Sequence, residues 1–96
     1  MTYKLFSTDG QFIKNLDNIP PSYNKYEKIT GFILFFDGNK QWYKDGILHR
    51  EDGPAFECHN GSKVWYVNGK RHKLDGPAIE WHDGAKVWFI DDKRIY

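Results

Sequence analysis

The sequence predicts a single small all-β domain built from consecutive antiparallel β-hairpins. The first observation is that Trp42, Trp65 and Trp88 follow one another at intervals of 23 residues. The second is that the segment Asp-Gly-Pro-Ala at 52–55 returns at 75–78, after the same interval. Glycine and lysine residues share this period, at Gly38, Gly61, Gly84, Lys40, Lys63 and Lys86. So many coincidences at one period are typical of an array in which each copy is one structural unit.

The period sets the organisation of the chain. Three hairpin repeats span 32–54, 55–77 and 78–96, the last of them truncated, and residues 1–31 form an N-terminal capping hairpin and loop. A length of 96 residues leaves no room for two domains, so these parts form one domain. Aromatic residues make up 18% of the chain, and large rings suit the thin core of a sheet.

The N-terminal segment reads as a hairpin around Ser7–Gly10, flanked by the apolar stretches 3–6 and 11–13. Residues 14–27 are predicted to be a loop that can include one helical turn around 22–28, and no long helix is predicted. The end units of repeat arrays are commonly atypical, which fits a cap.

Each repeat is predicted to contain two tight turns and a Gly-Pro corner. Asn-Gly and Asp-Gly tolerate the positive φ that two-residue type I′ turns need. The corner removes a backbone donor and redirects the chain to the next copy. Asp91-Asp92 lacks the expected glycine, so we expect that turn to be looser. The turns are Asp37-Gly38, Asn60-Gly61, Asp83-Gly84, Asp45-Gly46 and Asn68-Gly69, and the corners are Gly53-Pro54 and Gly76-Pro77.

Two-residue turns also assign the two faces of the sheet. A turn centred on Asn60-Gly61 pairs Phe56 with Trp65 and places both on one face with Cys58 and Val67. That face is the predicted core, and its equivalents are Ile33, Phe35 and Trp42 in the first copy and Ile79, Trp81, Trp88 and Ile90 in the third. The opposite face is mixed, and we expect its rings to form an exposed stripe that includes Tyr43, Tyr66 and Phe89. Across the second turn, Trp42 faces His49 and Trp65 faces His72.

The strings His-Arg-Glu-Asp-Gly-Pro-Ala at 49–55 and His-Lys-Leu-Asp-Gly-Pro-Ala at 72–78, with the Trp-Tyr hairpins, resemble a short repeat of uncharacterised phage and bacterial proteins. That repeat is similar to the bacterial variant of the MORN repeat. The resemblance covers residues 32–96 and implies a MORN-like twisted sheet that acts as a binding or scaffolding surface. It brings no defined catalytic residues.

Two His-x-x-Asp pairs, His49/Asp52 and His72/Asp75, have the composition of a general-base device. The pair occurs twice in equivalent positions, however, and a single active site has no reason to be copied. We therefore interpret each Asp as bonded to its turn backbone and each His as packed on Trp and capping a strand end. The sequence predicts a protein that is not an enzyme.

Cys58, His59 and His82 raise the possibility of zinc, but zinc requires four convergent ligands. Cys58 and His59 are adjacent on a strand and point to opposite faces, so we predict no metal and no cofactor. Glu57 and Glu80 are a carboxylate pair of the kind that serves glycoside hydrolysis. Cross-strand charge partners for Lys or Arg of neighbouring strands are the simpler interpretation of these two residues.

Charge and composition bear on the compartment. Fourteen basic residues oppose 13 acidic ones, so bulk electrostatics favour neither nucleic acid nor an anionic membrane. Cys58 is the sole cysteine, which fits a reducing compartment. No apolar run is long enough for a membrane span, and the N-terminus lacks a secretory pattern. We expect a cytoplasmic protein, in the host cytoplasm if it is viral, with no membrane partner.

Two functions remain. The first is a protein-binding module, for example a phage accessory protein that binds and inhibits a host enzyme or defence component, with a host or bacterial protein as partner. The alternative is a nucleic-acid, nucleotide or phosphate-ligand binder using a basic aromatic edge. An open final strand at 93–96 favours a homodimer. The candidate binding residues are Tyr43, Tyr66, Phe89, Lys70, Arg71, Lys73, Lys93 and Arg94.

Overall fold

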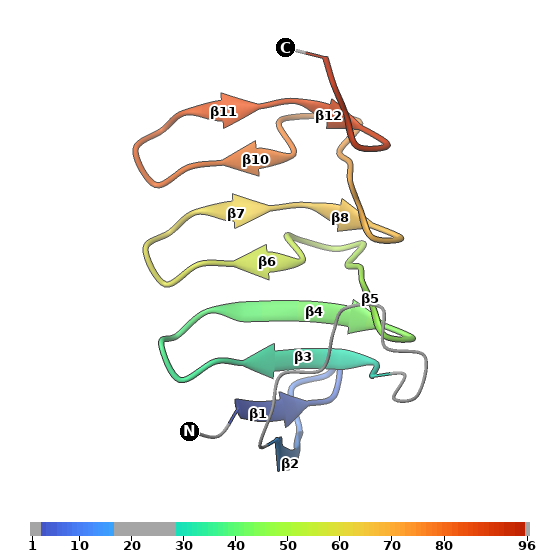
Figure 1. Cartoon of the computed structure of the whole chain (residues 1–96), viewed down its shortest axis with the longest axis vertical. Coiled ribbons are helices and arrows are strands. Elements are labelled where there is room, and N and C mark those ends of the chain that lie inside the picture. Colours follow the sequence, from blue (N-terminus) through green and yellow to red (C-terminus); the bar gives the residue numbers. More distant parts are fainter. Residues whose placement is uncertain (1–2, 17–28, 96) are drawn as a thin grey trace.

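The computed structural model describes residues 3–16 and 29–95, and all regular structure in these residues is β. The hairpins are stacked along the long axis of the molecule, with the N-terminal hairpin at one end (Figure 1). Every strand pairing among these residues is antiparallel, which confirms the predicted all-β fold of antiparallel strands. The strands are β1 (Tyr3–Phe6), β2 (Phe12–Leu16), β3 (Gly31–Leu34), β4 (Lys40–Lys44), β5 (Ile47–Leu48), β6 (Phe56–Glu57), β7 (Lys63–Val64), β8 (Tyr66–Val67), β9 (Lys70–Arg71), β10 (Ile79–Glu80), β11 (Lys86–Val87), β12 (Phe89–Ile90) and β13 (Lys93–Arg94).

One sheet runs through the whole array. Its strand order is β11-β10-β7-β6-β4-β3-β1-β2, with β5 paired to β4. The pairs β8-β9 and β12-β13 form two small separate sheets beside it. The second strand of one hairpin therefore pairs with the first strand of the next, as β4 does with β6 and β7 does with β10.

The N-terminal hairpin is present as predicted, but it joins the array in the opposite sense. Its first strand, β1, lies between β2 and β3, so β2 is the outermost of the described strands at that end of the sheet. Residues 14–16 belong to β2 and not to a loop, which corrects the start of the predicted loop. The rest of that predicted loop, and the helical turn at 22–28, lie outside the described residues.

The first turn of each repeat differs from the prediction. Gly61 N–H donates to Cys58 O at 3.0 Å, Cys58 N–H donates to Ser62 O at 2.9 Å, and Gly61 has a φ of +97°. These bonds define a three-residue loop in which the glycine is a bulge, and not a two-residue type I′ turn. The turns from Phe35 to Asn39 and from Trp81 to Ala85 have the same bonds.

The additional loop residue changes the register by one position. Phe56 pairs with Val64 and not with Trp65, and Glu57 pairs with Lys63. Because side chains alternate along a strand, such a slip exchanges the faces of one strand relative to its partner. The predicted core face is correct for Ile33 and Ile79, which are buried, but wrong for Trp81, which is 46% exposed.

Two apolar clusters stabilise the array. The larger one, beneath the N-terminal half, contains Leu5, Leu16, Ile29, Ile33 and Tyr43. The smaller one packs Val64 and Val87 against Ala78, Ile79 and Phe89.

A ladder of rings crosses the first four strands of the sheet. The centroids of Phe12 and Phe6 lie 5.7 Å apart, those of Phe6 and Phe32 4.8 Å, and those of Phe32 and Trp42 4.6 Å. Aromatic pairs at these separations stabilise beyond the area that they bury. The N-terminal hairpin is thus packed onto the first repeat by aromatic contacts as well as by its strand pairing.

The second turns are two-residue turns in all three copies, as predicted for Asp45-Gly46 and Asn68-Gly69. Both central residues have positive φ at Asp45-Gly46, Asn68-Gly69 and Asp91-Asp92. The expectation of a looser turn at Asp91-Asp92 is wrong. Asp92 N–H donates to Arg71 O at 2.9 Å, and its Oδ1 accepts from Arg71 N–H at 3.0 Å. Bonds to the preceding copy thus hold a conformation that glycine would otherwise favour.

Candidate functional site

Two loops join the repeats on one side of the sheet. The loop at 49–55 leads from β5 to β6, and the loop at 72–78 leads from β9 to β10 (Figure 1). Both begin with His, followed by a cation. In the first loop, the backbone N–H of His49 donates to Trp42 O at 3.0 Å. In the second loop, the backbone N–H of His72 donates to Trp65 O at 3.1 Å. The predicted Trp–His pairing is therefore confirmed.

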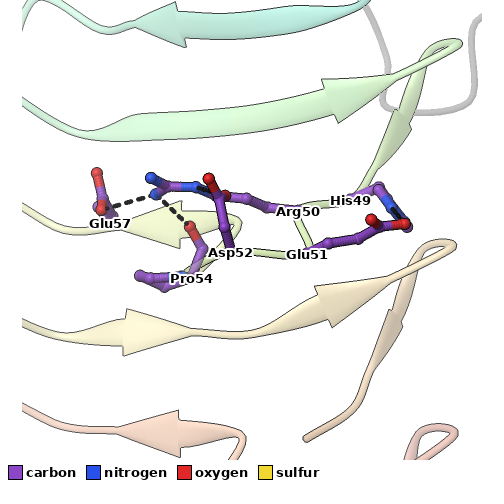
Figure 2. A network of polar contacts seen from close by, with 6 residues as sticks. All are labelled: His49, Arg50, Glu51, Asp52, Pro54 and Glu57. Atoms are coloured by element: carbon purple, nitrogen blue, oxygen red, sulfur yellow. Dashed lines mark hydrogen bonds and ion pairs between the residues drawn. The ribbon is translucent and has the colours of Figure 1, made fainter. Parts of the chain in front are cut away.

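Arg50 organises the first loop (Figure 2). Its Nε donates to Asp52 Oδ1 at 3.0 Å, and its Nη1 donates to Pro54 O and to Glu57 Oε1, both at 3.1 Å. The guanidinium also lies 3.8 Å from the centre of the Trp42 ring. A planar fork with several partners is held in one place, so Arg50 fixes both the loop and the ring.

Lys73 occupies the equivalent place in the second loop, with Nζ 3.9 Å from the centre of the Trp65 ring. A cation over a tryptophan therefore recurs one period apart. Such a contact is worth about 0.5–1 kcal/mol at exposed sites and more where water is excluded. The recurrence indicates that a cation over the tryptophan ring is a regular feature of this loop in both copies.

The histidines bond to the turn of the following copy. His49 Nδ1 accepts from Asn68 N–H at 2.9 Å, and His72 Nδ1 accepts from Asp91 N–H at 3.1 Å. The nearest carboxylate to His49 is Glu51, at 3.3 Å from Nε2, and not the Asp of the His-x-x-Asp pair. These contacts support the structural interpretation of the histidines.

A hollow lies beside each loop. The first has a volume of about 410 Å³ and the second about 660 Å³. Most of their walls are built from equivalent positions, with a tryptophan, a histidine and the cation that covers the tryptophan in both, and Arg50, Glu51 and Asp52 line both hollows. The corresponding pairs are Thr30 and Gly53, Trp42 and Trp65, Lys44 and Val67, His49 and His72, Arg50 and Lys73, Glu51 and Leu74, and Asp52 and Asp75. The repeat therefore produces two related recesses on one side of the molecule. We call this side, formed by residues 49–53 and 72–76, the loop face.

The loop face carries both signs of charge and an apolar group. In the first hollow, Lys44 and Arg50 oppose Glu51 and Asp52. In the second, the position of Glu51 is taken by Leu74, whose exposed fraction is 80%. The face is therefore suited to a ligand that combines charged and apolar groups, as a protein surface does.

The predicted ring stripe is not an exposed surface. Tyr43 and Phe89 are only 5% and 7% exposed, and both belong to the apolar clusters, because the register slip turns these rings inward. Burial raises the pKa of Tyr43 to about 12. Tyr66 is half-buried, and burial raises its pKa as well, while the charge of Arg71 opposes that effect.

The predicted basic cluster is divided. The Arg71 guanidinium lies 4.2 Å from the centre of the Phe89 ring, and its Nε donates to Asp92 Oδ1 at 2.7 Å. That hydrogen bond is the main reason why the pKa of Asp92 is lowered. Lys73 covers Trp65, whereas Lys70, Lys93 and Arg94 are exposed on β9 and β13. The structure therefore brings Lys73 to the loop face and leaves the other four cations elsewhere.

The sequence reasoning did not single out Arg50, Lys44 or Leu74 as surface-forming residues. A signal for Arg50 was present in the sequence, since Arg50 and Lys73 are cations at the same repeat position. Each of them follows the histidine that faces a tryptophan. Among residues 3–16 and 29–95, no group of three or more His, Cys, Asp or Glu side chains is placed to hold a metal ion. Cys58 is a half-buried free thiol.

No helix within the described part of the chain has the length and apolar character needed to cross a membrane. Comparison with known proteins gives no further identification. No protein-family model matches this sequence, and neither a curated protein nor a solved structure matches it.

Proposed function

We propose that this chain is a non-enzymatic protein-binding module whose partner docks on the loop face. The observation that carries this proposal is the pair of repeat-related hollows, each walled by a tryptophan with a cation over its ring. The wall of the first hollow is pre-organised, because hydrogen bonds and a ring contact already fix Arg50. A surface ordered in advance loses little conformational entropy when a partner binds.

A protein is the class of partner that fits the chemistry of this face. Leu74 is 80% exposed at the second hollow, and Ile47, on the adjoining strand β5, is 41% exposed. Exposed apolar groups with a charged surround are typical of protein interaction sites. Glu51, Asp52 and Asp75 would repel phosphate groups from the same recesses.

The nucleic-acid alternative has less support. Two of the cations on which it depended, Arg71 and Lys73, already lie over aromatic rings, and Arg71 is also paired with Asp92. Phosphate binding requires cations whose charge is available to replace counterions. The resemblance to phage and bacterial repeats supports a bacterial host protein as the partner, with inhibition of that protein as the outcome of binding.

The experiment compares two substitutions in a pull-down from bacterial lysate. Leu74→Asp places a charge on the loop face, and Phe36→Asp makes the same kind of change at the 60% exposed Phe36, in the first turn of repeat one. We expect one protein to be captured by the wild type and by Phe36→Asp, with at least a tenfold loss of affinity for Leu74→Asp. Equal retention by both variants, or capture of nothing, would overturn the proposal.

A second measurement addresses the alternative directly. Binding to single-stranded DNA and RNA is measured at about 50 and about 200 mM salt. A steep loss of affinity with salt would favour the basic edge, whereas no binding at the lower concentration would remove that function.

A further inference from the structure

The large sheet ends at strand β11, and this edge is a second surface, separate from the loop face. Within the described residues, β11 pairs with β10 alone and is the outermost strand of the large sheet (Figure 1). We call Lys86 and Val87 the β11 edge. Strands at an edge offer backbone donors and acceptors to a further strand.

The array itself shows what such a strand receives. In the first junction, Lys40 of β4 pairs with Glu57, and Gln41 pairs with Phe56. In the second, Lys63 of β7 pairs with Glu80, and Val64 pairs with Ile79. Both junctions thus place a carboxylate opposite a lysine, and a large apolar residue opposite the position that follows it.

The backbone completes the same pattern at both junctions. Trp42 N–H donates to Ala55 O at 2.7 Å, and Trp65 N–H donates to Ala78 O at 2.8 Å. The incoming segment is therefore Ala-Phe-Glu in one case and Ala-Ile-Glu in the other. A small residue, an apolar residue and a carboxylate are received in that order.

The β11 edge has the chemistry of the receiving strand. Lys86 and Val87 stand one period after Lys63 and Val64. Glu80 already pairs with Lys86 within the third hairpin, just as Glu57 pairs with Lys63 within the second. In the second hairpin the lysine also lies opposite a second glutamate, Glu80, on its other side. The same register on β11 would place a new carboxylate opposite Lys86 and an apolar side chain opposite Val87.

The edge lacks the side chains that would hold a whole further repeat. In the earlier copies, Asn39 Oδ1 and Ser62 Oγ accept from the N–H groups of His59 and His82, both at 2.9 Å. The equivalent position in the third copy is Ala85, which has no acceptor. Likewise, Ile95 replaces the imidazoles that cap the following turn, so the edge favours a single strand over a complete hairpin.

A second copy of this chain is a poor occupant. Its two matching segments lie in β6 and β10, and each of these strands already pairs on both sides. Of the described outer strands, β2 has the sequence Phe-Ile-Lys-Asn-Leu, which would bring Lys14 and no carboxylate, and a second β11 would bring only Lys86 and Val87. A segment of a different protein therefore fits this edge better than either outer strand of a second copy.

We propose that the β11 edge accepts, as an added antiparallel strand, an extended segment of a partner protein that carries a small residue, an apolar residue and a carboxylate in succession. Main-chain hydrogen bonds supply the affinity in this mode of recognition, and the alternating side chains supply the specificity. This binding goes beyond the function proposed for the loop face, since either surface can act without the other.

The test uses two labelled peptides and a charge exchange. One peptide has the sequence of residues 76–83, Gly-Pro-Ala-Ile-Glu-Trp-His-Asp, and in the other a lysine replaces its glutamate. Their binding to the wild type, to Lys86→Glu and to Lys70→Glu is measured by fluorescence anisotropy. Lys70 is an exposed lysine on β9, so its replacement changes the net charge equally at another place.

The wild type and Lys70→Glu are expected to prefer the glutamate peptide, and Lys86→Glu the lysine peptide. Cross-strand charge pairs of about 0.2–1 kcal/mol correspond to preferences of up to about fivefold in each direction. Chemical-shift changes on peptide addition should centre on residues 85–88. The absence of peptide binding, or a preference that Lys86→Glu leaves unchanged, would overturn the proposal.

These experiments can overturn either of the two proposals without overturning the other. Leu74→Asp is expected to leave peptide binding unchanged, because Leu74 lies on the loop face and not on β11. Peptide binding without capture by the loop face would leave only the strand-addition proposal standing, and the reverse result would leave only the loop-face function.

Discussion

His49 Nδ1 accepts a hydrogen bond from the backbone N–H of Asn68, 19 residues further along the chain, at 2.9 Å. His72 does the same for Asp91, and Thr30 Oγ1 does it for Asp45 in the first copy. An imidazole can accept at Nδ1 only when that nitrogen carries no proton. The histidines that resemble catalytic bases therefore join each repeat to the turn of the next.

Replacement of His49 by alanine should lower the free energy of unfolding by about 1–2 kcal/mol. The backbone N–H of Asn68 loses its acceptor, and such a loss costs about this amount. His49→Asn is the matched control, because its side-chain oxygen can take the place of Nδ1 and should restore a large part of the difference. Urea unfolding monitored by tryptophan fluorescence measures both variants. Equal stability of the alanine variant and the wild type would contradict the assigned role.

Gly31→Ala should strongly destabilise the junction between the N-terminal hairpin and the first repeat. The residue has a φ of +133°, and a Cβ there would lie 2.1 Å from the carbonyl oxygen of Phe6, where β1 pairs with β3. Backbone cannot yield as the end of a side chain does, so we expect a loss of more than about 3 kcal/mol.

Gly10→Ala provides the control for that experiment. Gly10 also has positive φ, at +92°, but a Cβ there meets nothing within 4 Å. We expect this variant to lose only the roughly 1–2 kcal/mol that an L-residue costs in the left-handed region. Similar thermal midpoints for the two variants would show that the Phe6 contact is unimportant.

Asp92→Asn should change the response of the protein to acid. The hydrogen bond from Arg71 lowers the pKa of Asp92 from its usual 3.8. The resulting stability is fully present above the unfolded pKa and is lost as the pH falls through the lower folded pKa. Unfolding followed from pH 6 to about pH 2 should therefore be less steep for Asp92→Asn at low salt. The difference should shrink at high salt, which screens this exposed pair; identical acid profiles at low salt would refute the expectation.

Tyr43→Phe should protect the protein at alkaline pH. Burial raises the pKa of Tyr43 from 10.0 to about 12, so the stability linked to its neutral form is complete below pH 10 and is lost as the pH rises through about 12. This difference corresponds to roughly 2–3 kcal/mol. The variant also loses the hydrogen bond from the Tyr43 hydroxyl to Gln41 Oε1, so it should be slightly less stable at neutral pH. The free energy of unfolding of both proteins is measured at neutral pH and at about pH 12, and the variant should be the less stable protein at the first pH and the more stable one at the second. The same difference in stability at all pH values would rule this out.

The sequence could predict the fold class and the repeat because both depend on local chemistry that recurs. A tryptophan, a glycine turn and an Asp-Gly-Pro corner at one spacing define a hairpin unit before any contact is known. The pairing of Trp42 with His49 and the positive-φ turn at Asn68-Gly69 followed from the same reasoning and are confirmed.

Register and exposure were beyond the sequence because they depend on a single residue in each first turn. The dipeptide Asn60-Gly61 fits a two-residue turn and equally a three-residue loop with a glycine bulge, and the two differ by one position in strand pairing. That one position decides which rings are buried, as it does for Tyr43 and Phe89. Gly31 gave no signal either, because its need for glycine comes from the carbonyl of Phe6, which is distant in the chain.

The sequence by itself determined that this protein is an array of antiparallel hairpins with equivalent residues in equivalent places, since turn preferences and strand periodicity act over a few residues. The tertiary structure alone decided which of those residues meet. It placed a cation over Trp42 and over Trp65 and set Lys86 on an outer strand, because such contacts depend on how successive copies are stacked.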